Sequence, residues 1–235
     1  MQPVESRFSP VHVGIITADL SRFPEFWLSL MRMYVPGGST YSHIRGNGFA
    51  IQRNEIVRQF LKGSAEWLWF IDDDHSFVAE TLMALLGRDV DIVQPLISTR
   101  KPPYRPYGYM WDSEHSEYVS IKWSDIPTNN SVMKVDAVGS GGTLYRRKVF
   151  ETISDPWFEE GKTYPDGIGE DLWLCRKCQL ANIQCWLDTG IRLGHMTTEE
   201  VWPVAHDGKW VIDLDQYHGV RVRVQPNIGM PKEVV

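Results

Sequence analysis

One short segment limits the possible folds most: an apolar run that is followed directly by three acidic residues. Residues 67–71 (WLWFI) are uninterrupted large apolar side chains, and the three aspartates 72–74 follow directly. A short apolar run bounded by a polar turn is typical of a strand buried on both faces of a sheet that helices cover. The three carboxyl groups then lie at the carboxyl end of the strand, where open α/β sheets bind ligands.

The segments around this strand alternate between strand and helix patterns, which predicts an α/β fold. The central sheet is expected to be mostly parallel, with helices on both faces. Expected strands in the first half are 11–17, 67–71 and 91–97, and expected helices are 24–34, 49–61 and 78–86. The second half is expected to add mixed strands at 117–122, 133–138 and 143–146, a glycine-rich turn at 139–142, a helix at 170–180 and weaker strands at 209–214 and 220–224.

Size and composition favour one globular domain. The chain has 235 residues, of which 43% are hydrophobic and 23% charged, so it has the apolar content to bury a sizeable core. Repeats and linker-like tracts are absent from the sequence. We therefore expect a single domain over residues 1–235, in which 196–235 is a C-terminal extension without an assigned role.

Charge and cysteine content limit the compartment and the partners. The first ten residues have no apolar core, and no stretch approaches the roughly 18 to 20 apolar residues of a spanning helix, so no membrane insertion is expected. Cys175, Cys178 and Cys185 form a poor disulfide framework and are interpreted as packing residues. The sequence predicts a cytoplasmic protein whose net charge of −6 disfavours wholesale binding to nucleic acid.

The acidic cluster itself has two interpretations. Adjacent carboxylates repel one another and raise one another's pKa, and a divalent cation relieves the repulsion and can hold a diphosphate alongside. The alternative is a solvated acidic turn. The position after a buried strand favours the cation site.

Four segments in order resemble glycosyltransferases of the GT-A type. WFIDDDHSF resembles the family's DxD segment, residues 134–147 its glycine-rich strand–turn–strand, residues 168–175 its acidic ED motif at a helix start, and residues 189–195 the segment of its late metal-binding histidine. The resemblance extends from about Val11 to His195. It implies a GT-A (Rossmann-like) fold and metal-dependent transfer of a sugar from a nucleotide-sugar donor, with a UDP-sugar favoured, to an acceptor hydroxyl.

The resemblance also implies a metal site. It assigns Asp74 and His195 as metal ligands, Asp72 to the metal or the donor ribose, and Asp73 to the donor. A carboxylate and an imidazole suit Mn²⁺ or Mg²⁺, and the histidine favours Mn²⁺. The alternative for His195 taken alone is a structural histidine.

The acidic pair at the predicted helix start is the candidate catalytic group. By the family pattern, Asp171 is the general base that deprotonates the acceptor, with inversion at the anomeric centre, and Glu170 is an acceptor or structural contact. Ordinary acidic capping of the helix is the alternative.

Donor contacts are expected from three further segments, by position in the family. The glycine-rich turn allows a backbone to approach a ligand closely, although a tight hairpin explains it as well. Arg53 also has an alternative on a solvated helix face. The predicted donor-binding residues, besides Asp72 and Asp73, are Thr17, Ala18, Asp19, Arg53, Asn54, Gly141 and Gly142.

Residues 98–109 interleave basic and tyrosine side chains, a mixture suited to phosphate contacts and stacking. The predicted acceptor contacts are Arg100, Lys101, Tyr104 and Arg105. A solvated proline-rich loop is the alternative. By analogy with phage transferases that modify hydroxymethylated bases, DNA is a candidate acceptor, and a phage protein would act in the host cytoplasm.

Two other classes use similar residues. A metal-dependent nuclease or phosphohydrolase also clusters carboxylates and histidine around cations, but here the only other strong acidic pair is Glu170 with Asp171. A non-catalytic nucleotide-sugar binding module on the same fold would tolerate loss of Asp171. The intact set of motifs favours the transferase.

Overall fold

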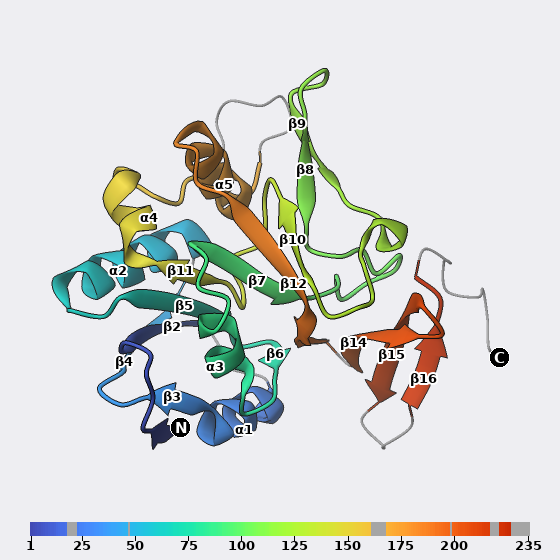
Figure 1. Ribbon diagram of the computed structural model, residues 1–235, viewed down its shortest axis with the longest axis horizontal. Coiled ribbons are helices and arrows are strands. Elements are labelled where there is room, and N and C mark those ends of the chain that lie inside the picture. The colour runs from blue at the N-terminus through green and yellow to red at the C-terminus, as the bar shows by residue number, and fades with distance from the viewer. Residues whose placement is uncertain (18–22, 47, 161–167, 198, 217–220, 227–235) are drawn as a thin grey trace.

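The computed structural model is a mixed α/β protein in which helices cover both faces of a large sheet (Figure 1). It describes residues 1–17, 23–46, 48–160, 168–197, 199–216 and 221–226. The strands are β1 (Gln2–Val4), β2 (Val11–Thr17), β3 (Tyr34–Pro36), β4 (Thr40–Arg45), β5 (Trp67–Asp72), β6 (His75–Ser76), β7 (Ile92–Leu96), β8 (Tyr109–Asp112), β9 (Glu117–Ser120), β10 (Val132–Val135), β11 (Leu144–Arg146), β12 (Cys185–Arg192), β13 (Gly194–Met196), β14 (Glu199–His206), β15 (Lys209–Gln216) and β16 (Arg221–Val224). The helices are α1 (Pro24–Arg32), α2 (Phe49–Lys62), α3 (Thr81–Leu86), α4 (Arg147–Thr152), α5 (Glu170–Leu180) and the 3-10 helix η1 (Trp123–Asp125).

The central sheet has seven strands in the order β10-β12-β7-β11-β5-β2-β4. The pairs β5–β2, β2–β4 and β12–β7 are parallel. Strand β11 runs antiparallel between β5 and β7, and β10 runs antiparallel to β12 at the edge. The α/β class is therefore confirmed, and the sheet is more evenly mixed than the sequence predicted, because β11 enters its centre from a short connection to the glycine-rich turn.

Strand β5 has large apolar side chains on both faces of the central sheet, and helices cover each face. Its residues Leu68 and Phe70 belong to one core cluster together with apolar residues of α2, α4 and α5, and Trp67, Trp69 and Ile71 belong to the other together with α1 and α3. All five side chains are at most 5% exposed. Burying each large apolar side chain contributes roughly 1.5–3 kcal/mol, so neither face of the strand tolerates solvent.

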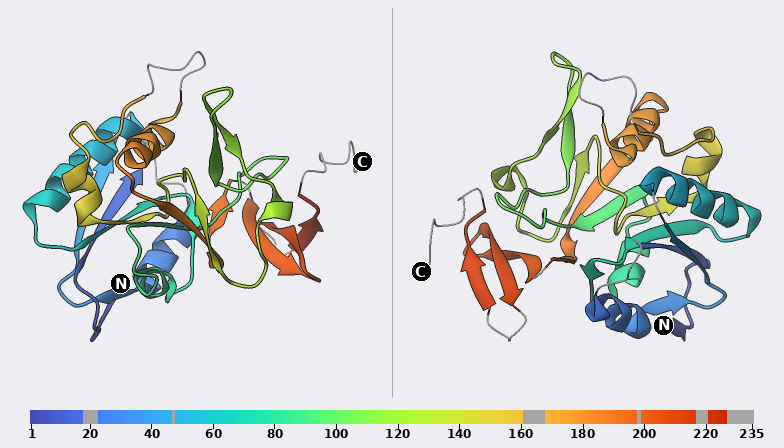
Figure 2. Two further views of the ribbon diagram at one scale, coloured as in Figure 1. Left: turned by 45° about the horizontal axis from the view of Figure 1, so that its top comes forward. Right: turned by 180° about the vertical axis from the view of Figure 1, so that it is seen from behind.

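Several element boundaries differ from the sequence prediction because tertiary hydrogen bonds override the local pattern. The helix expected over 24–34 ends at Arg32, since Tyr34 begins β3, which pairs with β1. The helix expected over 78–86 begins at Thr81, because Ala79 O accepts a hydrogen bond from Tyr34 N. The strand expected over 117–122 pairs with β8 in a separate hairpin, which projects from the body of the molecule (Figures 1 and 2).

The C-terminal strands continue a second sheet that begins near the carboxyl end of β5. Its order is β16-β15-β14-β13-β6, with every pairing antiparallel (Figure 2). The sheet packs on η1 through Trp210, whose Nε1 donates to Ile126 O at 3.0 Å and whose ring lies 5.9 Å from that of Trp123. The expected C-terminal extension is thus hydrogen-bonded to β13, although the single-domain organisation stays a prediction.

The cysteines behave as packing residues. Cys175 and Cys178 on α5 and Cys185 on β12 are buried and free, and all three belong to the core cluster under α5. Burial raises the pKa of the Cys178 thiol well above its usual value. This matches the packing interpretation of the C-x-x-C pair.

No helix in the described part of the chain is long and apolar enough to cross a bilayer.

Candidate functional site

A cavity of about 680 Å³ opens where β2, β5 and β7 end. This is the edge of an open α/β sheet at which ligands bind. Its walls also include the start of α5, the glycine-rich turn before β11 and the loop after β7. The ionic side chains that line it are five carboxylates and two guanidinium groups: Asp72, Asp73, Asp74, Glu170, Asp171, Arg53 and Arg100.

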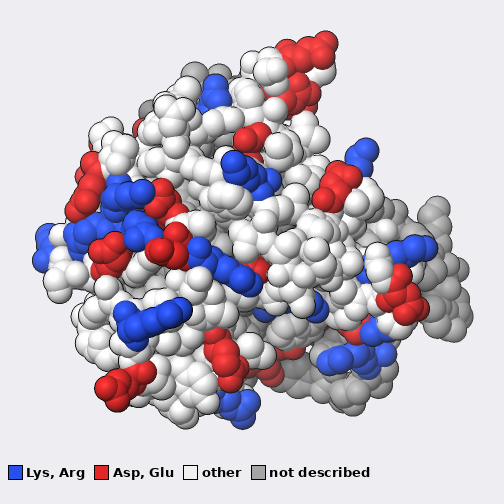
Figure 3. All heavy atoms as spheres, viewed as in Figure 1, with Lys and Arg blue, Asp and Glu red and all other residues white. Residues whose placement is uncertain are grey.

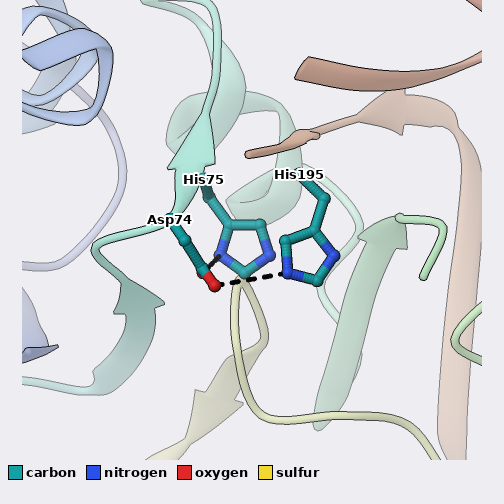
Figure 4. Close-up of side chains that lie close together, drawn as sticks. All are labelled: Asp74, His75 and His195. Carbon is teal, nitrogen blue, oxygen red and sulfur yellow. Dashed lines mark ion pairs between the residues drawn. The ribbon is translucent and has the colours of Figure 1, made fainter. Parts of the chain in front are cut away.

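Asp74, His75 and His195 form a compact group at one end of the cavity (Figure 4). Strands β6 and β13 pair antiparallel with His75 opposite His195, and the two rings stack with centroids 4.8 Å apart. Asp74 Oδ2 lies 3.4 Å from His195 Nε2, and Asp74 Oδ1 lies 3.6 Å from His75 Nδ1. One carboxylate oxygen therefore faces each imidazole.

The hydrogen bonds around this group leave ligand atoms open. His195 Nδ1 lies 2.8 Å from Ser98 O, and a carbonyl can only accept, so Nδ1 carries the proton and Nε2 presents a lone pair toward Asp74. His75 Nδ1 and Asp74 Oδ1 are buried and have no hydrogen-bond partner among the described residues. Buried polar atoms are rarely left unpaired, so the donor set fits a divalent cation.

The protonation states suit the same role. Burial lowers the pKa of His75 to about 3, which keeps its imidazole neutral. Burial would raise the pKa of Asp74, but the neighbouring His195 and the charge of Arg100 hold that pKa well below its ordinary value. The group offers two imidazoles and one carboxylate, the form in which these residues bind metal ions.

Glycines let the strands approach closely enough to build this end of the cavity. A Cβ on Gly141 would lie 2.6 Å from Asp72 Oδ2 and 2.8 Å from His75 Cε1, too close for any other residue. A Cβ on Gly194 would lie 2.7 Å from the Trp202 ring. Glycine therefore lets the turn approach the end of β5, and lets β13 lie close to the Trp202 ring of β14.

Arg53 organises the other end of the cavity. Its side chain projects from α2 and is 4% exposed. Nη1 contacts Glu170 Oε1 and, at 2.5 Å, Asp171 Oδ1, while Nη2 lies 3.3 Å from Asp72 Oδ2. One buried guanidinium thus joins the end of β5 to the start of α5.

At this end three carboxyl groups share one guanidinium. Burial lowers the pKa of Arg53, but the charges of Asp171, Asp72 and Glu170 outweigh it and hold that pKa above its ordinary value, so the guanidinium stays charged. Burial raises the pKa of Asp72 to about 7 even though Arg53 opposes the shift, and burial also raises the pKa of Glu170. Partial protonation of Asp72 near neutral pH relieves the repulsion among the carboxyl groups.

Most of the residues predicted for the site lie together. The cavity is lined by the acidic cluster, the acidic pair of α5 and two basic residues from separate segments. The predicted residues that line it are Arg53, Asp72, Asp73, Asp74, Arg100, Gly141, Glu170, Asp171 and His195.

Four predicted ligand contacts are not among the residues that line the cavity. Asn54 Nδ2 donates to Phe158 O at 2.7 Å and its Oδ1 accepts from Phe158 N, so its amide is used by the backbone. Tyr104 is 4% exposed and packs in the core. Gly142 has φ of +84° and packs on β7 and Leu193, so it turns the chain. Thr17 Oγ1 bonds to His43 Nε2 at 2.9 Å.

The remaining predicted contacts have other positions. Lys101 and Arg105 are exposed on the loop after β7 and are not among the residues that line the cavity. Ala18 and Asp19 lie outside the described residues.

Sequence reasoning missed His75, Phe23 and Phe49, which line the cavity. His75 follows the acidic cluster directly, which was the available signal. Its pairing with His195 was hidden because the two residues meet only through the β6–β13 pairing.

No protein-family model and no curated protein sequence matches the chain. Among solved structures, the chain is similar to A197 from STIV, with a TM-score of 0.58, 15% identity and coverage of 94% of this chain and 98% of that chain. It is also similar to GalNAc-T7, crystallised with UDP, GalNAc and Mn²⁺, with a TM-score of 0.51, 12% identity and coverage of 82% of this chain and 45% of that chain. The likeness establishes the fold, which is that of GT-A glycosyltransferases.

Proposed function

We propose that the chain is a metal-dependent glycosyltransferase that moves a sugar from a nucleotide-sugar donor to an acceptor hydroxyl. The observation that carries the proposal is that the open Asp74, His75 and His195 group faces the same cavity as Glu170 and Asp171. The fold supports it, because the similar GalNAc-T7 was crystallised with UDP, GalNAc and Mn²⁺.

Asp74, His75 and His195 would hold the metal ion. When bound, a divalent ion supplies charge stabilisation for the leaving nucleoside diphosphate. Two imidazoles favour Mn²⁺ over Mg²⁺, which prefers oxygen ligands. Asp72 lies beside this group but pairs with Arg53, so we assign it to the donor rather than to the metal.

Asp171 is the proposed base. Arg53 holds its Oδ1, which orients the carboxylate at the start of α5. Its carboxylate takes the proton of the acceptor hydroxyl as the hydroxyl oxygen bonds to the anomeric carbon and the bond from that carbon to the diphosphate oxygen breaks. Direct displacement of this kind inverts the anomeric centre. Glu170, held by the same guanidinium, is placed to contact the acceptor.

The donor class we propose is a UDP-sugar, and the first acceptor to test is hydroxymethylated DNA. Over α2, α4 and β11, basic side chains lie among acidic ones rather than in one continuous patch (Figure 3). Arg146, for example, is paired with Glu66, Asp89 and Asp91. The described residues of this face therefore offer no continuous basic patch to a polyanionic acceptor.

The deciding experiment measures nucleoside diphosphate release from a panel of nucleotide sugars with Mn²⁺, Mg²⁺ or EDTA, and with Asp74→Asn as the site variant. Slow hydrolysis by water makes an acceptor unnecessary. Metal-dependent release from one donor, lost with EDTA and in the variant, supports the proposal. Cleavage of phosphodiesters without any donor turnover would instead support a nuclease, and donor binding without turnover a binding module.

A further inference from the structure

Arg100 is the guanidinium group of the cavity whose partner can be exchanged. Among the described residues that line the cavity, the only lysine or arginine side chains are Arg53 and Arg100. Arg53 is buried and held by three carboxylates. The Arg100 side chain is 45% exposed, and its Nη1 contacts Asp74 Oδ2 at 2.7 Å.

The oxygen that Arg100 contacts is the one that faces His195. Asp74 Oδ2 lies 3.4 Å from His195 Nε2, the nitrogen that carries the free lone pair. A cation bound between these two atoms would lie next to the guanidinium, and like charges at such a separation repel strongly where little solvent intervenes. Arg100 and a divalent cation therefore compete for Asp74.

Hydrogen bonds between its two ends hold the loop that carries Arg100. The side chain of Arg100 can therefore change its partner by rotation, without a movement of the loop. Thr99 N donates to Arg105 O at 2.8 Å, and Arg105 N donates to Thr99 Oγ1 at 2.9 Å. Ser98, two residues before Arg100, accepts the hydrogen bond of His195 Nδ1. The backbone of Arg100 therefore stays beside the metal group whichever partner its side chain takes.

A nucleoside diphosphate needs a positive partner in this cavity beyond the metal ion. Five carboxylates line the walls, and Arg53 is already committed to three of them. A planar guanidinium with two parallel donors matches phosphate oxygens well. Among the described lining residues, Arg100 is the group with this chemistry that remains.

We propose that Arg100 is a positioning residue with two alternative partners. In the free protein it neutralises Asp74, and when a divalent cation takes Asp74 it moves to the phosphate oxygens of the nucleoside diphosphate. This inference rests on the proposed function, because the second partner is the donor's diphosphate. It replaces the sequence-based assignment of Arg100 to the acceptor.

The test measures Mn²⁺ affinity without donor, from the electron paramagnetic resonance signal of free Mn²⁺, and UDP affinity at saturating Mn²⁺, by calorimetry. It compares the wild type with Arg100→Gln and Arg105→Gln. Arg105 is the matched control, because it carries the same charge on the same loop outside the cavity lining. Thermal melting checks that all three proteins are folded.

Arg100→Gln is expected to bind Mn²⁺ about three- to tenfold more tightly and UDP about tenfold more weakly, while Arg105→Gln leaves both affinities within about twofold. Unchanged or weaker Mn²⁺ binding by Arg100→Gln, or unchanged UDP binding, overturns the exchange and leaves metal-dependent transfer standing. Absence of Mn²⁺ binding in both the wild type and Arg100→Gln overturns the metal site, and the proposed function with it.

Discussion

The two ends of the cavity handle buried charge in opposite ways. At the Arg53 end, three carboxylates share one buried guanidinium, so each carboxylate has an ion-pair partner within the protein. At the His195 end, His75 Nδ1 and Asp74 Oδ1 are buried with no hydrogen-bond partner among the described residues, and the cation present is the half-exposed Arg100. The first end pairs each of its carboxylates with Arg53, whose Nε alone lacks a partner among the described residues, whereas the second end leaves unpartnered atoms on two neighbouring candidate metal ligands.

We therefore expect the Arg53 end to matter most for the stability of the protein and the His195 end for metal binding. Removing one partner of a buried charge network leaves the others uncompensated, so changes at the Arg53 end should strongly lower the stability of the protein. Changes at the His195 end should abolish metal binding with little loss of stability, because the arginine that pairs with Asp74 there is half-exposed and can be solvated without it. The predictions below test this separation, beginning with the largest expected effect.

Replacing Arg53 should cause the largest loss of stability. Arg53→Met leaves Asp72, Glu170 and Asp171 crowded without a counter-charge, which should lower the free energy of unfolding by about 3–5 kcal/mol at pH 8. The loss should be smaller at pH 5, because protonation of the carboxyl groups relieves their repulsion. Urea unfolding at both pH values measures the effect.

The control for Arg53 is the triple neutral variant Arg53→Met with Glu170→Gln and Asp171→Asn. It should recover part of the lost stability, because two of the stranded charges are gone. If Arg53→Met alone unfolds at the same urea concentration as the wild type, the Arg53 end does not hold β5 and α5 together.

Replacing Asp74 should cause the largest loss of activity with the smallest change of shape. Asp74→Asn keeps the size of the side chain but removes the charge that faces both imidazoles, so metal-stimulated donor turnover should fall at least about 100-fold. The stabilisation that Mn²⁺ gives the wild type in thermal melting should also disappear.

Asp112→Asn is the matched control for Asp74, because Asp112 lies at the end of β8, away from the cavity lining. Asp112→Asn should keep both the donor turnover and the stabilisation by Mn²⁺ in thermal melting. Full turnover by Asp74→Asn would show that the group of Asp74, His75 and His195 is not needed for the reaction.

His12 is a buried histidine whose two ring nitrogens both have hydrogen-bond partners, whereas His75 Nδ1 has none among the described residues. His12 Nδ1 bonds to Thr40 Oγ1 at 2.8 Å and Nε2 to Ser42 Oγ at 2.9 Å, and burial lowers the pKa of His12 to about 4. At pH 5 the unfolded chain, with a histidine pKa of about 6.5, binds a proton that the folded protein does not. The free energy of unfolding is therefore not reduced by His12 above about pH 6.5, and it falls by about 2 kcal/mol on going to pH 5.

The measurement compares unfolding free energies at pH 7.5 and pH 5 for the wild type and His12→Gln. The pH-dependent part should shrink by about 2 kcal/mol in the variant. An identical pH dependence in both proteins would show that His12 is protonated equally in the folded and unfolded states.

The smallest effect is expected at an exposed ion pair on the same helix as Arg53. Arg58 Nη2 contacts Asp155 Oδ1 at 2.9 Å, with both side chains more than 40% exposed. Arg58→Ala should lower the free energy of unfolding by less than about 1 kcal/mol, because solvent screens such pairs. A loss as large as that of Arg53→Met would mean that burial does not distinguish these two arginines.

Several features of the fold could be predicted because they depend on local patterns. Residues 67–71 are apolar on both faces, so a strand covered on both sides follows from the sequence. The helical spacing over 49–61 likewise predicted α2 to within one residue. The small shifts elsewhere, such as the early end of α1, arose where a partner strand competed for the backbone.

The site was predicted less evenly. The resemblance to GT-A glycosyltransferases implied that Asp74 and His195 lie close together, and they do. Asn54 and Tyr104 were expected to contact the donor and the acceptor, but they bond and pack within the protein, because residue type does not say which way a side chain points from its helix or loop. Arg53 was expected near the donor, but its three ion pairs come from segments far apart in the chain.

The sequence by itself determined the class of the fold and the residue types of the acidic edge, because apolar periodicity and a strand that ends in aspartates act over a few neighbouring residues. Only the tertiary structure decided that His75 joins His195 across β6 and β13, that Arg53 closes one end of the cavity, and that Arg100 covers the other. The physical reason is that these contacts depend on strand pairing and on the glycines that allow close approach, both of which involve segments that meet only after folding.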